Sequence, residues 1–197
     1  MFKQRLLQSM KYIIGVALLI TGIFSYLYYQ EVKEEQRQWK RFVNHFYHSI
    51  DRSLGRIDTI IAEQPKAEQL EQRIALLEKE LYTAETTLAN GHYFLDGAIY
   101  YSYDLFDPFT SFLFGTKTSV NGIVRLELPP MSEDQLLDED ELALLKALRD
   151  ILKETKDAMY SPDTKQENPE LTVEEFNEII TTHLDKDKLQ LYKDTLE

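Results

Sequence analysis

The sequence predicts an all-α protein, in which a single N-terminal transmembrane helix continues into an antiparallel helical hairpin and a small helical bundle. Three observations support this prediction. Residues 12–30 carry no charged side chain, apolar residues then recur at helical spacings, and turn signals separate the periodic segments. We expect five parts: a basic tail (1–11), a transmembrane helix (12–30), a long helical hairpin with an aromatic return segment (31–114), a linker or loop (115–131), and a C-terminal helical segment that packs on the hairpin (132–197).

The uncharged run at residues 12–30 reads YIIGVALLITGIFSYLYYQ and lies between Lys11 and Glu31. As a helix it is about 28 Å long, close to the hydrocarbon thickness of a bilayer. A cleaved signal peptide is the competing interpretation, because the chain begins with a basic tail and an apolar core. The run is longer than a usual signal core, ends in bulky residues and lacks a small-residue cleavage site. We therefore expect an uncleaved signal-anchor in the cell membrane.

The basic residues on the two flanks of the run give a weak signal for orientation, because their numbers are nearly equal. A short basic tail usually stays in the cytoplasm, and a long C-terminal domain can cross the membrane regardless of nearby charge. We expect a single-pass protein whose C-terminal domain is extracytoplasmic. The flanking residues are Lys3, Arg5 and Lys11 before the run, and Lys33, Arg37, Lys40 and Arg41 after it.

The chain beyond the tail is strongly acidic. The net charge is −12, and the first eleven residues hold three basic and no acidic side chains, so the remainder carries −15. Such a charge repels nucleic acid, which argues against a nucleic-acid partner. A merely solubilising surface is the simplest interpretation. The chain has no cysteine, which excludes a lipoprotein anchor, disulfides and thiolate–metal sites.

Two periodic segments on either side of Pro65 predict the hairpin. We expect the first to continue the membrane helix, and the second to run through Gly91 as a heptad stripe and to end at Asp107-Pro108. In an antiparallel pair of this length, facing residue numbers sum to about 129, which would bring Ala98 opposite Glu31. The apolar positions are Trp39, Val43, Phe46, Ile50, Leu54, Ile57 and Ile61 in the first segment, and Leu70, Ile74, Leu77, Leu81, Ala84, Leu88, Gly91, Leu95 and Ala98 in the second.

The segment that returns toward the anchor is rich in aromatic residues. Tyrosine suits the headgroup layer of a bilayer, so we hypothesise that residues 99–114 lie at the membrane interface. Two alternatives are that the rings fill the bundle core, or that they line a pocket for a small apolar or lipid-like ligand. The candidate residues are Tyr100, Tyr101, Tyr103, Phe106, Phe109, Phe112 and Phe114.

Shorter signals organise the rest of the chain. Asn121-Gly122, between apolar residues, predicts a small β-hairpin. Ser132 with Gln135, and Thr172 with Glu175, each predict a helix start with a capping box. The first of these helices should stop at Ser161-Pro162.

No motif in the sequence predicts catalysis. His45, His48 and Asp51 share one helical face and could hold a divalent metal, but solvent-exposed histidines are the simpler interpretation. Phosphate-binding loops, H-E-x-x-H and nucleophile-elbow motifs are absent from the sequence. We therefore expect no enzyme activity, no cofactor and no metal. An enzyme remains the third possibility after the two below.

The expected function is that of an interaction or scaffold protein in the membrane. The acidic helical bundle would engage another membrane-associated protein, or a second copy of the chain, in addition to membrane lipid. Heptads and the small residues Ala17, Thr21 and Ser25, four apart within the run, favour association. The alternative is a membrane-anchored sensor that binds a small apolar or lipid-like ligand.

Overall fold

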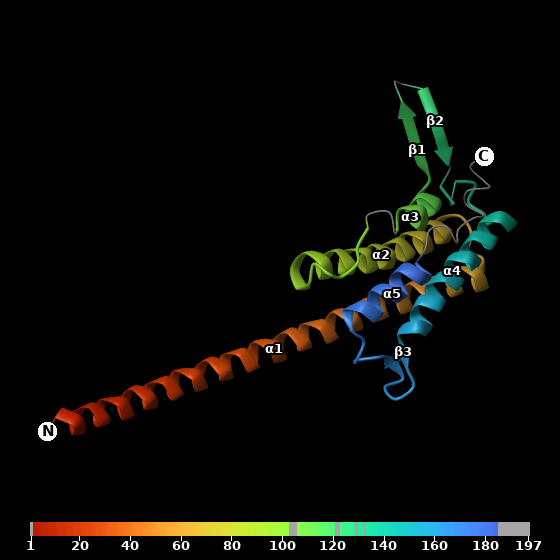
Figure 1. The fold of residues 1–197 in the computed structure, drawn as a ribbon. Helices are drawn as coiled ribbons and strands as arrows, with labels where there is room; N and C mark the ends of the chain where they lie inside the picture. Colours follow the sequence, from red (N-terminus) through yellow and green to blue (C-terminus); the bar gives the residue numbers. More distant parts are fainter. Residues whose placement is uncertain (1, 103–105, 121–122, 129, 132, 185–197) are drawn as a thin grey trace. The chain divides into compact units, whose positions relative to one another are not determined.

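The computed structural model describes residues 2–102, 106–120, 123–128, 130–131 and 133–184 (Figure 1). Side chains are described from Ile14 onward, except at positions 107, 112 and 116–128. The chain divides into two compact units, Met1–Lys40 and Arg41–Glu197. The described part is mainly helical, which confirms the predicted all-α class.

The first unit is the N-terminal part of one long helix. α1 runs over Phe2–Glu63 without interruption, a length of 62 residues. This confirms that the uncharged run and the first periodic segment form one helix. Within the described residues, no helix is both long and apolar enough to cross a membrane. The predicted span at residues 12–30 therefore stays a proposal, and its first two residues, Tyr12 and Ile13, lie outside the described side chains.

The second unit begins with a helical hairpin. After α1 ends at Glu63, the chain reverses around Pro65, and α2 (Glu68–Asn90) runs back along α1. Arg52 of α1 bonds Glu80 of α2, and Phe42 of α1 lies against Gly91 just beyond α2. The predicted reversal is confirmed, but the register differs. Phe42 faces Gly91, whereas the predicted register would set it opposite Thr87.

The second helix is shorter than predicted. α2 ends at Asn90, one π-helical turn covers Gly91–Leu95, and the backbone is extended at Asp96. The predicted continuation as far as Asp107 is therefore wrong, and Ala98 lies outside any helix. Pro108 lies in the first turn of α3 (Asp107–Phe114) instead of ending a helix. Proline is tolerated there because the first-turn N–H groups lack helical acceptors in any case.

A β-hairpin follows α3, within the segment predicted as a linker. β1 (Thr116–Val120) pairs antiparallel with β2 (Ile123–Leu128), with one irregularity in register after Thr118. The pairing of Val120 with Ile123 confirms the predicted hairpin. Its turn, Asn121-Gly122, lies outside the described residues.

Two more helices follow in the described part of the second unit. α4 spans Glu139–Met159, and α5 spans Val173–His183. A short hairpin, β3 (Tyr160–Ser161) with β4 (Gln166–Glu167), lies between them. The capping box of Thr172 and Glu175 at α5 is confirmed.

The predicted start of α4 at Ser132 is wrong. Asp138 caps α4, and Glu141 completes its capping box. Gln135, predicted to be inside the helix, has a φ of 64°, which is incompatible with a right-handed helix. Ser132 lies outside the described residues. A carboxylate at Asp138 caps as well as a serine does, and the sequence between 132 and 138 offers both.

The core of the second unit is formed by one face of each helix. The predicted apolar stripe of α2 is buried from Leu70 to Leu88, and α1 buries Phe46, Ile50 and Ile57 completely. Phe176 of α5 inserts between Phe42 and Phe46, with ring centroids 5.2 and 5.4 Å apart. The helical bundle is thus centred on the C-terminal half of α1.

Candidate functional site

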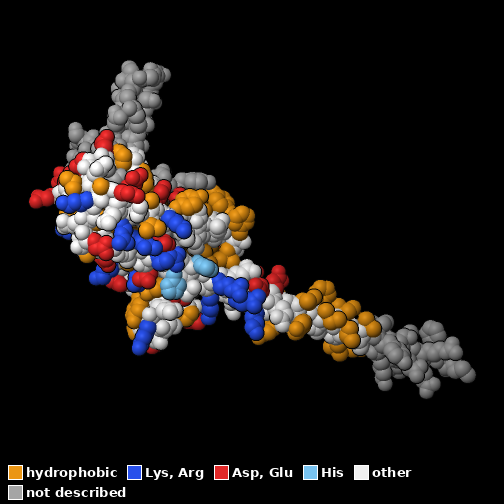
Figure 2. All heavy atoms as spheres, turned by 180° about the vertical axis from the view of Figure 1, so that it is seen from behind, with side chains coloured by type: hydrophobic (Ala, Val, Ile, Leu, Met, Phe, Trp, Pro, Cys, Tyr) orange, Lys and Arg blue, Asp and Glu red, His pale blue; other side chains and the backbone are white. Residues whose placement is uncertain are grey.

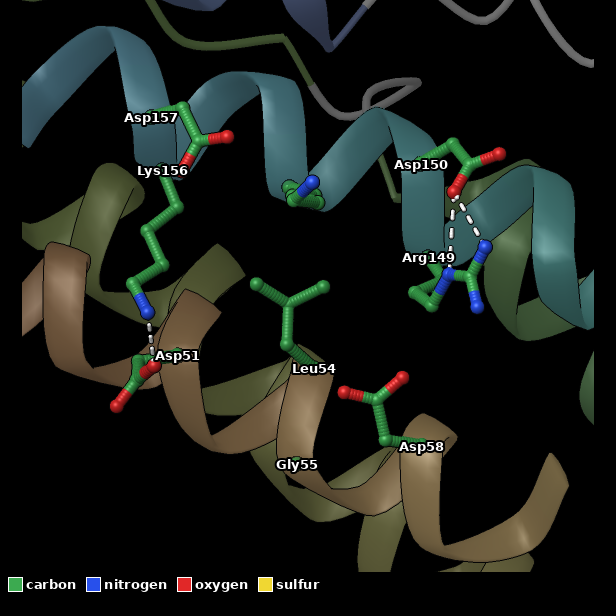
Figure 3. A pocket seen from close by; sticks show the side chains of 9 residues that line it. Asp51, Leu54, Gly55, Asp58, Arg149, Asp150, Lys156 and Asp157 are labelled. Atoms are coloured by element: carbon green, nitrogen blue, oxygen red, sulfur yellow. Dashed lines mark hydrogen bonds and ion pairs between the residues drawn. The ribbon is translucent and has the colours of Figure 1, made fainter. Parts of the chain in front are cut away.

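A groove lies on the second unit between α1 and α4 (Figure 3). Its volume is about 620 Å³, within the range of small-molecule sites. Leu54 forms the apolar floor, and the position over Gly55 is open, with no atom within 4 Å of where a Cβ would stand. The remaining lining residues are charged: Asp51, Asp58, Arg149, Asp150, Lys153, Lys156 and Asp157.

One end of the groove is closed by an ion pair between the two helices. Lys156 of α4 bonds Asp51 of α1, and its Nζ lies 5.7 Å from the centre of the Tyr47 ring. The bond to Asp51 raises the pKa of Lys156, against the opposing effect of burial. Burial raises the pKa of the Tyr47 phenol. Lys156 therefore remains charged and Tyr47 neutral at neutral pH, which keeps this end of the groove closed.

At the other end of the groove, no ion pair joins the described residues of α1 to those of α4. The Arg149 guanidinium bonds Asp150 on its own helix at 3.1 and 2.9 Å. The Asp58 carboxylate of α1 is directed toward α4 in Figure 3, and no ion pair joins it to a described residue of α4. This end is therefore open and carries both signs of charge.

The histidine–aspartate trio does not form a metal site in the described part of the chain. Asp51 bonds Lys156, His45 is exposed, and His48 is half-buried with its ring edge-on to Tyr47. Among the described side chains, no group of three or more acidic or histidine residues is placed to hold a metal ion.

The aromatic candidates separate into buried and exposed sets. Phe106 and Phe109 are only 1% exposed and pack on each other in the core. Core burial leaves these two rings no surface for lipid, which agrees with the alternative that the rings fill the bundle core. Tyr100 and Phe114 are exposed and Tyr101 is half-buried. Tyr103, and the side chain of Phe112, lie outside the described residues.

None of the aromatic candidates whose side chains are described lines the groove between α1 and α4. Exposed rings gather instead in the π-helical turn, where Phe94 is 84% and Tyr93 55% exposed. His92 donates a hydrogen bond to the carbonyl of Ile99 at 2.8 Å, and its ring contacts Tyr93 and Tyr101. We call Tyr93, Phe94 and Tyr100 the aromatic patch.

The aromatic patch is held by a side chain from α5. Asn177 donates to the carbonyl of Ala98 and accepts from the N–H of Tyr100, both at 2.7 Å. The side-chain amide thus pairs with the backbone on either side of Ile99, which is buried. The rings are exposed on a fixed loop, since three side-chain bonds and a buried anchor residue hold it.

The association candidates lie on the first unit. Ala17, Thr21 and Ser25 are exposed on α1, and the Thr21 hydroxyl donates to the carbonyl of Ala17 at 2.9 Å. Around them, all side chains from Ile14 to Gln30 are exposed, and Figure 2 shows apolar side chains along this part of the helix. The large ones, 46–69% exposed, are Ile14, Val16, Leu18, Leu19, Ile20, Ile23, Phe24, Tyr26, Leu27, Tyr28 and Tyr29.

The charged residues of the groove were not singled out from the sequence, apart from Asp51. A signal was present, because Arg149, Lys153 and Lys156 recur at spacings of four and three on α4 in an otherwise acidic chain. Comparison with known proteins adds no further candidate, since no family model, curated protein or solved structure matches the chain.

Proposed function

We propose that the protein is a single-pass, membrane-anchored interaction protein, in which the uncharged run of α1 is the anchor and the second unit engages another membrane-associated protein. The observation that carries the anchor is the exposure of every side chain from Ile14 to Gln30. Eleven of these are large and apolar. Covering them by lipid instead of water is worth on the order of 20 kcal/mol.

The proposed location is the cell membrane, with the N-terminal tail in the cytoplasm and the second unit outside it. We expect the run to be kept as an anchor because it ends in bulky residues, whereas a signal peptidase cleaves after small ones. The bulky residues are Tyr26, Leu27, Tyr28 and Tyr29. Ala17, Thr21 and Ser25 would allow two such helices to approach closely in the bilayer.

The surface proposed to meet the partner is the aromatic patch. Tyrosine and other aromatic side chains dominate binding hot spots, and rigid presentation lowers the entropy lost on binding. The surrounding chain is acidic, with Asp96 in the same loop, so a partner with basic residues around an apolar centre fits it best.

Membrane extraction tests the anchor. The full chain is expected to stay in the membrane fraction after washing at alkaline pH, and Leu19→Arg with Ile23→Arg is expected to release it, because charges at the bilayer centre cost several kcal/mol. The matched control is Leu76→Arg with Tyr82→Arg, two exposed apolar positions of α2, which should leave retention unchanged. Release of the unaltered chain by the same wash would contradict the proposal.

Co-purification from detergent extract tests the partner. A protein that co-purifies with the full chain should be lost when Tyr93, Phe94 and Tyr100 are replaced by Ser. Tyr82→Ser, a change at a 61% exposed tyrosine outside the patch, should leave it bound. If lipid alone co-purifies with the unaltered chain, the interaction role is wrong and the ligand-sensing alternative gains.

That alternative has one observation in its favour, the groove between α1 and α4. It differs from the expected ligand site, because charged side chains form its walls and the described aromatic candidates lie elsewhere. A polar ligand suits it better than an apolar or lipid-like one.

A further inference from the structure

We propose that the groove between α1 and α4 binds a small zwitterion with a short apolar body, a free amino acid or a dipeptide. Arg149 and Lys153 would take its carboxylate, Asp58 its ammonium, and the floor at Leu54 and Gly55 its apolar part. This inference does not depend on the membrane anchor, because all the residues involved belong to the second unit.

The size and floor of the groove set the size of the ligand. A volume of about 620 Å³ accommodates an amino acid or a dipeptide with room for water. Gly55 leaves open space directly over the floor, where a larger residue would fill the groove. Leu54 lies beside it, 8% exposed, and is the one apolar side chain among the described lining residues.

The closed end limits where the ligand charges can lie. Lys156 is bonded to Asp51, and this bond raises the pKa of Lys156. This pair is less exposed than that of Arg149 and Asp150, with side chains 27% and 45% exposed, so a ligand displaces it less readily. The free charges are therefore those of the middle and the open end.

At the open end, the charges available are of both signs. Arg149 bonds only its neighbour Asp150 among the described residues, and the two side chains are 35% and 61% exposed. Such a surface pair contributes little and is readily exchanged for a ligand carboxylate, which a guanidinium binds through two parallel hydrogen bonds. Asp58 and Lys153 have no hydrogen bond or ion pair with any described residue, and each offers a single charge.

The charge balance of the lining selects a zwitterion over a simple ion. Four carboxylates and three cations surround the groove. A purely anionic ligand would meet Asp58, Asp150 and Asp157, and a purely cationic one would meet Arg149 and Lys153. A ligand with an ammonium toward α1 and a carboxylate toward α4 meets the opposite sign on both sides.

Titration calorimetry on the full chain in detergent micelles tests the proposal. The probes are leucine, leucylleucine, and two half-charged analogues of leucine, 4-methylpentanoate without the ammonium and 3-methylbutylamine without the carboxylate. We expect leucine or leucylleucine to bind at least tenfold more tightly than both analogues. Absence of binding by both zwitterions, or equal binding of the analogues, overturns the proposal.

Substitutions locate the binding in the groove. Asp58→Asn and Arg149→Gln should each weaken zwitterion binding at least tenfold, and Gly55→Leu should abolish it by filling the floor while every charge remains. Asp163→Asn and Arg73→Gln remove the same charges from positions outside the groove, and these variants should bind normally. Circular dichroism of each variant checks the fold. Normal binding by folded Asp58→Asn and Arg149→Gln overturns the assignment.

Discussion

Gly91 lies against the ring of Phe42 so closely that a Cβ on Gly91 would stand 2.3 Å from Cε2 of that ring. The ring cannot move freely aside, because Phe42 is buried and packs on Phe176. The absence of a side chain at Gly91 therefore lets the end of α2 approach α1. Its backbone is right-handed helical, so glycine is needed here for space and not for conformation.

Replacing Gly91 with Ala should destabilise the protein by about 1–3 kcal/mol, because the added methyl group overpacks the contact with Phe42. Gly55→Ala is the matched control. Gly55 is also inside a helix, but nothing lies within 4 Å of its Cβ position, so alanine should stabilise by about 0.5–1 kcal/mol. Chemical unfolding of both variants measures the difference. If both variants changed the free energy of unfolding in the same direction, the close approach of Gly91 to Phe42 would be contradicted.

Glu80 links the two arms of the hairpin and should couple more strongly to its partner than an exposed ion pair does. Its side chain is 12% exposed and bonds Arg52 at 2.7 Å, with Arg56 at 3.8 Å. A double-mutant cycle of Glu80→Gln and Arg52→Gln should give a coupling free energy of about 1 kcal/mol. This is less than a fully buried charged pair would give, because Arg52 is half-exposed and water screens the interaction. The same cycle for Glu63 and Arg73, both exposed, should give about 0–0.5 kcal/mol.

Glu141 should make the protein less stable as the pH rises. Burial, with the nearby charges of Asp138 and Asp134, raises its pKa to about 7, although the N–H of Asp138 opposes the shift. The folded state therefore holds this proton more tightly than the unfolded state does. Between the model-peptide pKa of 4.5 and about 7, each rise in pH costs folding stability.

The variant Glu141→Gln keeps an oxygen for the capping box and removes the charge. It should match the unaltered protein below pH 4.5 and be more stable by roughly 1–2 kcal/mol at pH 8. For Glu175 the dependence of stability on pH has the opposite sign, because hydrogen bonds from the N–H and hydroxyl of Thr172 lower the pKa of Glu175. Glu175→Gln should therefore be less stable at neutral pH and equal at low pH. Unfolding curves across this pH range that show the same difference at every pH would rule out the raised pKa of Glu141.

Asn177 should control the order of the aromatic patch. Asn177→Leu removes both bonds to the loop, leaves the N–H of Tyr100 and the carbonyl of Ala98 without their partner, and should cost about 1–2 kcal/mol. Faster hydrogen exchange at the Tyr100 amide is the specific signature. Thr181→Ala, on the same helix, removes only a hydroxyl bonded to its own helix and should leave that amide protected. Unchanged exchange in Asn177→Leu would contradict the role of Asn177.

Local patterns in the sequence predicted much of the fold. Heptad spacing identified the buried face of α2, Pro65 located the chain reversal, and Thr172 with Glu175 located the start of α5. Each signal acts over four to seven residues. The register of the hairpin was mispredicted, since it depends on the loop at residues 64–67, where Gln64 and Ala67 adopt positive φ values that apolar periodicity does not report.

The candidate site was harder to predict, because it depends on which helices pack together. The aromatic residues looked equivalent in sequence, but Phe106 and Phe109 turn into the core and Phe94 does not. Asp58 and Arg149 are 91 positions apart in the chain, and only the packing of α4 on α1 brings them to one groove. No local spacing contains that information.

Labelling single cysteines in intact cells tests the central claim that the uncharged run crosses the membrane. The chain has no cysteine, so Ser9→Cys introduces a single cysteine before the run and Asp163→Cys introduces a single one after it. A membrane-impermeant maleimide added outside should label Cys at 163 at once and Cys at 9 only after lysis. Labelling of both positions from the same side of the membrane would contradict the span, and the reverse pattern would keep the span but invert its orientation.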